Sequence, residues 1–322
     1  MTTTRRTERT ASPSFTDSEA DSRADSDAES RTDSGGGRID AGRVLVVGGT
    51  GKSGRRVAAL LPGARVGSRG GSPAFDWDQP ADWPAVLTDI EAVYLSYPTD
   101  IAAPGAAERL ARFARVAAER GVRRLVLLSG RGMPWAADSE RAVTASGLEW
   151  TVLRGSWFAQ NFSEEFVAEE VRRGSFTLPV PATTAEPFVD LDDLAEVAVA
   201  ALTRPGHAGR VYALTGPRAL DMTEVAETLS AALGRPVVFR SVAPDAYRRQ
   251  LVALGLPAAE AELLTHLFTE IFDGRNTPTS DDIPTVLGRP ARDLAAYAHR
   301  AATAGAWPAP EAAATAATAA TA

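Results

Sequence analysis

Apolar runs of strand length alternate with segments of helical periodicity through the middle of this chain. The runs typical of buried strands are Val44–Val47, Arg65–Val66, Val93–Leu95, Leu125–Leu128 and Thr151–Leu153. Residues 106–120 repeat apolar side chains at helical spacing and end before Gly121, as a crossover helix does. The apolar face of that helix consists of Leu110, Phe113, Ala114 and Ala117. The alternation predicts an α/β protein with a doubly wound parallel sheet.

Two later helices are marked by acidic residues at their starts. Asp190 and Asp193 open a helix whose apolar side is formed by Leu194, Val197, Ala201 and Leu202. Asp221 with Glu224 makes a capping-box-like start to a helix that ends before Gly234. Both fit the same alternating architecture.

The rest of the chain is less regular. From about Trp157 onward the alternation loosens and proline-broken stretches appear, which predicts a smaller C-terminal region on the substrate side of the sheet. Residues 1–40 hold almost no large apolar side chains, so burial cannot offset the entropy of ordering them. The predicted organisation is a disordered tail over residues 1–40, a sheet domain over 41–156, a substrate-side region over 157–305 and a flexible tail over 306–322.

A glycine-rich loop follows the first strand and leads directly into a helical segment. Its residues are Gly48, Gly49, Thr50, Gly51, Lys52, Ser53 and Gly54. Glycines at this spacing permit a tight turn and a close approach of backbone N–H groups to a pyrophosphate, and the helix N-terminus adds partial positive charge. The loop predicts that residues 41–156 form a Rossmann-type dinucleotide-binding domain. A merely structural turn is the alternative. A P-loop NTPase fails on spacing, because its leading glycine would stand where Val46 lies.

The end of the second strand indicates which dinucleotide binds. An Asp or Glu at this place would hold the ribose hydroxyls of NAD, but Ser68 and Arg69 follow Gly67 instead. A guanidinium can bind a 2′-phosphate through two parallel hydrogen bonds. NADP(H) is therefore the expected cofactor and NAD(H) the less favoured one. The alternative is that Arg69 is only a solvated loop arginine.

Composition narrows the function further. The 322 residues include no cysteine and three histidines, so thiolate chemistry is excluded and we expect no metal site. The net charge of −7 gives no field that attracts nucleic acid or an anionic membrane. No apolar run has the length of a membrane span, and the N-terminus lacks the apolar core of a secretion signal. We expect a cytoplasmic protein that acts on a small molecule.

Several motifs together resemble a known family. They are Gly48–Gly54, Phe75–Trp77, Leu125–Gly130, Gly147–Arg154, Trp157–Phe162 and Pro187–Asp193. The combination is similar to the NmrA-like, atypical short-chain dehydrogenase/reductases over residues 43–303. Within that group the Trp157–Phe162 segment and the Leu287–Pro290 ending look most like the ergot-alkaloid imine reductases of the festuclavine synthase and agroclavine dehydrogenase type.

The resemblance implies positions for the site residues. Asp76 would lie beside the adenine, Ser96 and Tyr97 would line the ribose and nicotinamide side, and Ser129 with Gly130 would lie near the nicotinamide. The implied substrate pocket contains Met133, Trp135, Trp157, Phe158, Asn161 and Phe162. The plainer alternatives are that Ser129 caps a strand end and that the aromatic residues belong to the core.

The chain departs from ordinary short-chain dehydrogenases at the catalytic acid. Those enzymes use a Tyr and a Lys one helical turn apart, but the only lysine here is Lys52, in the glycine loop. Arg154 and Gly155 also stand where the family usually has Arg-Pro. Hydride transfer without that acid favours an iminium or a conjugated, quinone-like acceptor, with Ser129 and Tyr97 as candidates for orienting or protonating it.

A second hypothesis belongs to another class of protein. A redox sensor would bind NADP(H), turn nothing over and signal to a protein partner. The two hypotheses differ in the pocket, since an enzyme needs an open, aromatic-lined cavity and a sensor does not.

Overall fold

The computed structural model describes residues 37–98, 100–164 and 166–308. Most of both predicted tails, residues 1–36 and 309–322, lies outside the described residues.

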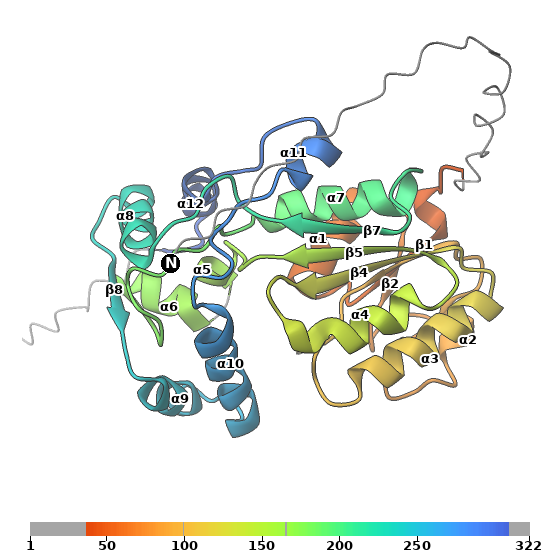
Figure 1. Cartoon of the computed structure of the whole chain (residues 1–322), viewed down its shortest axis with the longest axis horizontal. Coiled ribbons are helices and arrows are strands. Elements are labelled where there is room, and N and C mark those ends of the chain that lie inside the picture. Colours follow the sequence, from red (N-terminus) through yellow and green to blue (C-terminus); the bar gives the residue numbers. More distant parts are fainter. Residues whose placement is uncertain (1–36, 99, 165, 309–322) are drawn as a thin grey trace, which may run out of the picture. The chain divides into compact units, whose positions relative to one another are not determined.

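A six-stranded parallel sheet forms the centre of the fold, in the order β2-β1-β3-β4-β5-β7 (Figure 1). The strands are β1 (Val44–Val47), β2 (Arg65–Gly67), β3 (Ala92–Leu95), β4 (Arg124–Gly130), β5 (Glu149–Gly155) and β7 (Arg210–Leu214). The strand order steps outward from β1 in both directions, so a switch point lies between β1 and β3. The predicted doubly wound sheet is confirmed.

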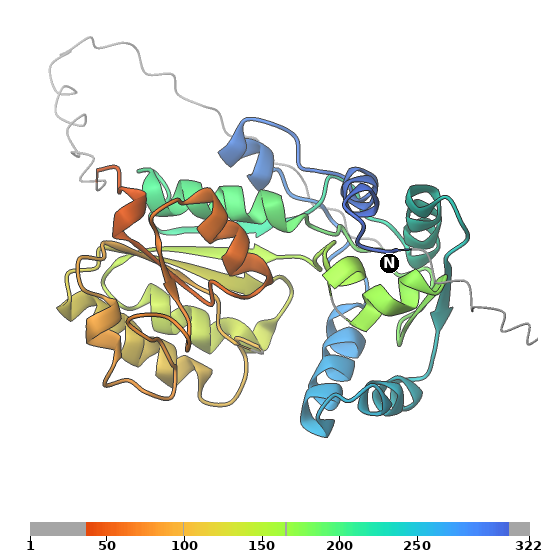
Figure 2. The same cartoon turned by 180° about the vertical axis from the view of Figure 1, so that it is seen from behind.

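Helices cover both faces of the sheet (Figures 1 and 2). They are α1 (Lys52–Leu60) and α7 (Leu191–Thr203) on one face, and α2 (Trp83–Val86), α3 (Ala106–Glu119) and α4 (Ala137–Thr144) on the other. Short 3-10 helices stand at Ala41–Arg43 and Pro134–Ala136. In β1, Val44 and Val46 pack with α7, whereas Leu45 and Val47 pack with α3. Burial on both sides explains why this strand is a continuous apolar run.

The chain returns to the sheet after it has begun the substrate-side region. Both α7 and β7 lie within the 157–305 range, yet α7 packs on the sheet and β7 pairs with β5. Asp190 caps α7 as predicted, its carboxylate accepting from the amide of Asp192 at 2.9 Å. The substrate-side region is therefore built from the remaining elements of that range.

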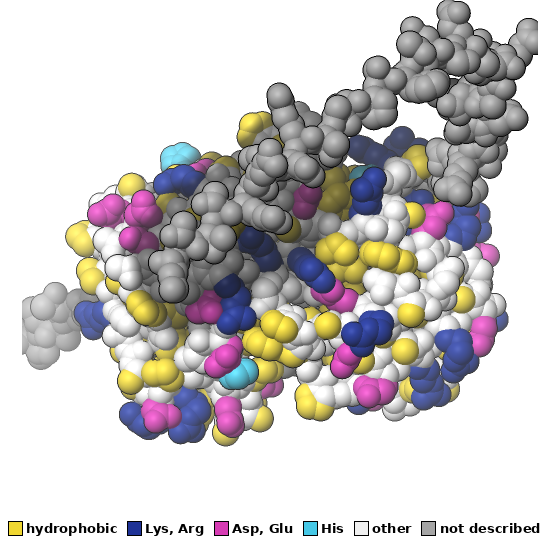
Figure 3. Space-filling view, viewed as in Figure 1, with side chains coloured by type: hydrophobic (Ala, Val, Ile, Leu, Met, Phe, Trp, Pro, Cys, Tyr) yellow, Lys and Arg dark blue, Asp and Glu magenta, His cyan; other side chains and the backbone are white. Residues whose placement is uncertain are grey.

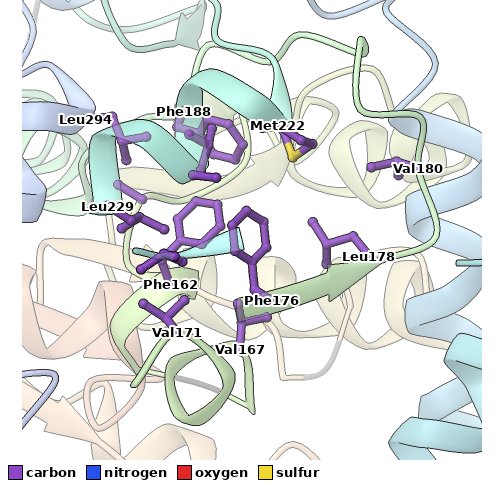
Figure 4. Close-up of a cluster of buried hydrophobic side chains, with 14 of the residues drawn as sticks. Phe162, Val167, Val171, Phe176, Leu178, Val180, Phe188, Met222, Leu229 and Leu294 are labelled. Atoms are coloured by element: carbon purple, nitrogen blue, oxygen red, sulfur yellow. The ribbon is translucent and has the colours of Figure 1, made fainter. Parts of the chain in front are cut away.

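These remaining elements have their own core around a parallel pair of short strands. They are α5 (Asn161–Glu164), α6 (Phe166–Arg172), β6 (Ser175–Leu178), α8 (Met222–Leu233), β8 (Val238–Ser241), α9 (Pro244–Ala253), α10 (Ala258–Ile271) and α12 (Leu294–Thr303). The exception is α11 (Asp282–Leu287), whose Ile283 is buried with α7 in the cluster on the sheet. The rings of Phe162, Phe176 and Phe188 meet in that core (Figure 4). The predicted capping box of α8 is present, with Asp221 and Glu224 bonded to each other's backbone.

The folded part extends slightly beyond both predicted limits. Ile39 is buried, and its amide donates to the carbonyl of Thr203 at 3.0 Å. At the other end, the indole of Trp307 is buried and donates to the carbonyl of Phe162 at 2.8 Å. Single apolar residues inside polar or alanine-rich sequence carry little periodic signal, which is why neither contact was predicted.

The described surface is mixed in charge. Figure 3 shows acidic and basic side chains interspersed over the face in view. Among the described helices, none has both the length and the apolar character needed to cross a membrane.

Candidate active site

The glycines of the loop after β1 have different tasks. A Cβ atom on Gly54 would lie 2.2 Å from the carbonyl oxygen of Gly48, so this glycine allows α1 to pack against the loop. Gly48 itself has φ +73°, and a Cβ there would meet the carbonyl of Ser96 at 2.8 Å. A Cβ on Gly51 would find only one neighbour within 4 Å, the carbonyl oxygen of Gly48 at 3.3 Å. Gly51 is thus the glycine whose missing side chain leaves space open.

The N-terminus of α1 is suited to hold an anion. Gly51 is its N-cap, so no side chain caps the helix, and its first turn contains no acidic residue. The amides of the first turn therefore have no acceptor within the helix. Thr50 and Gly51 are exposed beside them. This fits the pyrophosphate of a dinucleotide.

Arg69, the residue predicted to bind a 2′-phosphate, lies on the loop after β2. Arg69 is exposed, and it makes no ion pair or hydrogen bond with other described residues. The carbonyl of Ser68 accepts from the amides of Gly71 and Phe75, at 3.0 and 2.9 Å, which fixes the loop around Arg69. Asp76 is half-buried, and its carboxylate accepts from the amide of Asp78 at 2.9 Å.

A cavity of about 340 Å³ opens at the carboxyl ends of β3, β4 and β5. Of the predicted site residues, it is lined by Lys52, Ser53, Ser96, Tyr97, Ser129, Gly130, Met133, Trp157, Phe158 and Asn161. In Figure 1, β4 and β5 end on the side where α5 and α10 lie. The cavity therefore connects the loop after β1 with the substrate-side region.

Two residues expected in the pocket lie elsewhere. Phe162 is buried in the core of the substrate-side region, which matches the plainer alternative for that aromatic residue (Figure 4). Trp135 is not among the lining residues, and its ring lies 5.7 Å from that of His266. A periodic aromatic pattern does not reveal which side of a segment faces a cavity.

The aromatic wall of the cavity is rigidly packed. Trp157 stacks on Phe268 of α10, with ring centroids 4.4 Å apart and an interplanar angle of 11°. Phe158 lies so close to the end of β5 that a Cβ on Gly155 would meet its ring at 3.0 Å. The glycine that replaces the family's usual proline thus makes room for Phe158.

A buried pair of hydrogen bonds fixes the segment that carries this wall. The side-chain amide nitrogen of Gln160 donates to Oδ1 of Asp190 at 2.8 Å. The side-chain oxygen of Gln160 accepts from the backbone amide of Leu191 at 3.0 Å. Asp190 is also bonded to Arg300 of α12. The start of α7 therefore determines where Trp157 and Phe158 lie.

Lys52 joins the glycine loop to the substrate-side region. Its Nζ donates to Oδ1 of Asn161 at 2.7 Å and lies 5.8 Å from the ring centroid of Phe158. Two neighbouring arginines of α1, Arg55 and Arg56, pair with Glu164 at the end of α5. Three cations of α1 thus hold the short helix that contributes Asn161 to the cavity.

The two predicted catalytic hydroxyls are both bonded to other groups. Ser129 is buried and donates to Oε1 of Glu140 at 2.6 Å. Tyr97 lines the cavity, and its hydroxyl accepts from Nη1 of Arg109 at 3.2 Å.

Glu140 is held in its ionised form. Burial alone would raise the pKa of Glu140, but the hydrogen bonds from Arg154 and Ser129 outweigh it and keep that pKa below its ordinary value. Nε and Nη2 of Arg154 reach the two carboxylate oxygens at 2.9 and 2.5 Å.

Sequence reasoning missed several lining residues, among them Asp100, Arg131, Leu267 and Ile271. Asp100 and Arg131 follow β3 and β4 at the ligand-binding edge of the sheet, and that position is a usable signal. Leu267 and Ile271 are one helical turn apart on α10, but nothing in the sequence places α10 against this edge.

The fold and site define a dinucleotide-binding protein of the Rossmann class with a pocket beside the cofactor cleft. The sequence matches the profile of the NmrA-like family over residues 137–297. It is 31% identical over 281 residues to the NAD(P)H azoreductase of Xenophilus azovorans, covering 79% of this chain and 96% of that protein. It is also 30% identical over 276 residues to festuclavine synthase II of Penicillium roqueforti, covering 77% and 94%.

The fold has a solved counterpart. The NADPH-dependent quinone oxidoreductase of Escherichia coli superposes with a TM-score of 0.68 at 20% identity, covering 80% of this chain and 99% of that chain. The protein belongs to the NmrA-like family, and the resemblance predicted from its motifs is confirmed.

Proposed function

We propose that this protein is an NADP(H)-dependent reductase that transfers hydride to a conjugated or iminium-type small molecule. The observation that carries the proposal is the cavity. It begins at Lys52 and Ser53 of the phosphate-binding helix and ends at the stacked aromatic wall around Trp157, so cofactor and acceptor would meet inside it.

The chain's own residues fit the dinucleotide. The uncapped N-terminus of α1 would receive the pyrophosphate, and the open space at Gly51 lets it approach. Arg69, exposed on the loop after β2, would pair with the 2′-phosphate. The relatives support the same cofactor class, since one is named for NAD(P)H and the fold's solved counterpart for NADPH.

The acceptor class follows from the lining. When bound, the reduced nicotinamide supplies a hydride. The wall formed by Trp157 and Phe158 would orient a flat conjugated acceptor and exclude water. Two of the relatives are named for azo compounds and for quinones, and both classes of acceptor are conjugated.

The open aromatic-lined cavity favours turnover over a purely sensing role. The test is oxidation of NADPH, followed by its absorbance, against a panel of cyclic imines, azo dyes and quinones. We expect turnover with at least one of them, and weaker turnover with NADH. NADPH that binds but is oxidised by no acceptor would overturn the reductase proposal in favour of the sensor.

A further inference from the structure

We propose that Asp100 is the proton donor for acceptors that carry no positive charge of their own. This inference rests on the proposed reductase function and adds a catalytic residue to it. Asp100 lies beyond the carboxyl end of β3 and lines the cavity together with Ser129 and Trp157. Among the described residues that line the cavity, it is the only carboxylic acid.

The other polar groups of the cavity are arranged differently. Ser129 directs its proton away from the cavity to Glu140. The hydroxyls of Tyr97 and Ser96 accept hydrogen bonds from Arg109 and Ser53, so these two bonds do not use their own protons and Tyr97 is the competing donor. Lys52 is bonded to Asn161, and Arg131 donates to the carbonyls of Asn276 and Pro278. A guanidinium also keeps its proton at any pH of interest.

The surroundings of Asp100 favour its neutral form. Its exposed fraction is 9%, and no described cation forms an ion pair with it. Among the hydrogen bonds between described residues, the only one to its carboxylate comes from the amide of Ala102, to Oδ1 at 2.6 Å. Burial raises the pKa of Asp100 above its ordinary value, although the bond from Ala102 acts in the opposite direction.

Two hydrogen bonds hold the backbone at Asp100 and at the residue after it. The buried hydroxyl of Ser139, on α4, donates to the carbonyl of the next residue, Ile101, at 2.6 Å. The backbone amide of Asp100 donates to the carbonyl of Pro98 at 2.8 Å. These bonds keep the backbone of Asp100 at the edge of the cavity, so its carboxyl group is presented there.

Reduction of an uncharged acceptor needs a proton donor as well as a hydride. A quinone accepts a hydride at one end of its conjugated system and then carries negative charge on an oxygen. That oxygen takes the proton of Asp100, so the acceptor gains two hydrogens, NADP⁺ is left, and the Asp100 carboxylate is protonated again by water. A permanently charged iminium needs only the hydride and becomes a neutral amine.

The test compares these two acceptors in the Asp100→Asn variant, which keeps the shape and an acceptor for Ala102. We expect the quinone kcat to fall by about 100-fold, within the range for loss of a general acid. We expect reduction of an N-alkyl iminium to change less than about threefold. Asp138→Asn, an exposed aspartate on α4, is the matched control and should alter neither rate.

A second measurement is independent of turnover. The protein without cofactor should show an infrared carboxylic-acid band that is absent from the Asp100→Asn variant. That band should disappear over the same pH range in which quinone reduction slows. Lys52, Tyr97 and Arg131 line the same cavity and remain unchanged in this comparison.

Several results would overturn the proposal. One is an equal loss of kcat with both acceptors in the Asp100→Asn variant. Another is a higher KM for the iminium alone, which would make Asp100 a cation-binding carboxylate. A third is a carboxylic-acid band that has disappeared by about pH 4, the ordinary range for aspartate. If the unmodified protein reduces the iminium but never the quinone, the proton-donor role fails while the reductase stands. If it reduces nothing, the proposed function itself fails.

Discussion

The hydroxyl of Ser129 donates to the carboxylate of Glu140 across 2.6 Å, in a buried site beside the cavity. Arg154 holds the same carboxylate from the other side. Ser129 stands at the end of β4, where the family resemblance implied a catalytic group. Because its proton is donated to the Glu140–Arg154 ion pair, the role that fits the contacts of Ser129 is to stabilise the end of β4.

Replacing Ser129 with alanine tests that role. We expect the Ser129→Ala variant to lose only a few-fold in kcat, because the hydroxyl directs its proton away from the cavity. We expect a stability loss of about 1–3 kcal/mol, since Glu140 would keep a buried oxygen with one donor fewer. Thermal unfolding and steady-state NADPH oxidation measure the two effects. Complete loss of turnover with NADPH still bound would instead make Ser129 essential to chemistry.

Alanine substitutions at two glycines of the phosphate loop should have different effects, one on cofactor affinity and the other on stability. Gly51→Ala adds a Cβ whose single close neighbour is 3.3 Å away, so the fold should survive while the pyrophosphate is obstructed. We expect NADPH affinity, followed by fluorescence, to weaken by about 10-fold or more. Gly54→Ala is the contrasting variant. Its Cβ would lie 2.2 Å from a backbone oxygen, which should cost about 3 kcal/mol or more of stability. Unchanged NADPH affinity in a folded Gly51→Ala protein would contradict the dinucleotide site.

Preference for NADPH should depend on Arg69. The Arg69→Glu change removes the proposed partner of the 2′-phosphate and places a negative charge beside it. We expect NADPH binding to weaken by about 10–100-fold and NADH binding to change little. Arg248→Glu, a partly exposed arginine on α9, is the matched control. Equal affinity of the unmodified protein for both cofactors would remove the basis for this assignment.

The sequence predicted the sheet well because its signals are local. A strand such as Val44–Val47 is buried on both faces, and the caps Asp190 and Asp221 directly precede the helices that they cap. The phosphate loop was predicted for the same reason, since a few consecutive residues set both its glycine spacing and its proposed contact with the pyrophosphate. Such features need no knowledge of the distant chain.

The substrate side was harder because it depends on contacts between distant residues. Phe162 and Trp157 belong to one short segment, yet one enters a core and the other lines the cavity. That difference is set by Gln160 bonding to the start of α7, and no pattern within the segment encodes it. Asp100 was missed for a related reason, since a single aspartate after a strand resembles any polar loop residue.

Buried Glu186 should make stability depend on pH. Its exposed fraction is 1%, and burial raises its pKa to about 8, against the smaller effects of the Trp157 amide and the charge of Arg131. The folded state therefore holds this proton more tightly than the unfolded state does. The resulting stabilisation is complete below about pH 4.5 and is lost as the pH rises to about 8.

Glu186→Gln should remove this dependence. At about pH 9 the variant should unfold at a higher temperature than the unmodified protein, by an amount worth up to about 5 kcal/mol, and near pH 4 the two should be similar. Melting curves across that range provide the measurement, and Glu119→Gln, on the exposed surface of α3, is the control. A difference that stays constant with pH would show that Glu186 does not bind its proton more tightly in the fold.

Trp157 should matter more to turnover than either predicted catalytic hydroxyl. Its ring lines the cavity and stacks on Phe268 at 4.4 Å, so it both shapes the acceptor site and fixes α10 against it. Trp157→Ala should lower kcat by about 100-fold, because the acceptor would lose its alignment for hydride transfer, and should leave NADPH affinity nearly unchanged. Trp157→Phe should recover much of the rate by restoring an aromatic face. Trp135→Ala, which removes a tryptophan that does not line the cavity, should have a small effect on kcat. If Trp135→Ala impairs turnover as strongly as Trp157→Ala, the acceptor does not sit against the Trp157 wall.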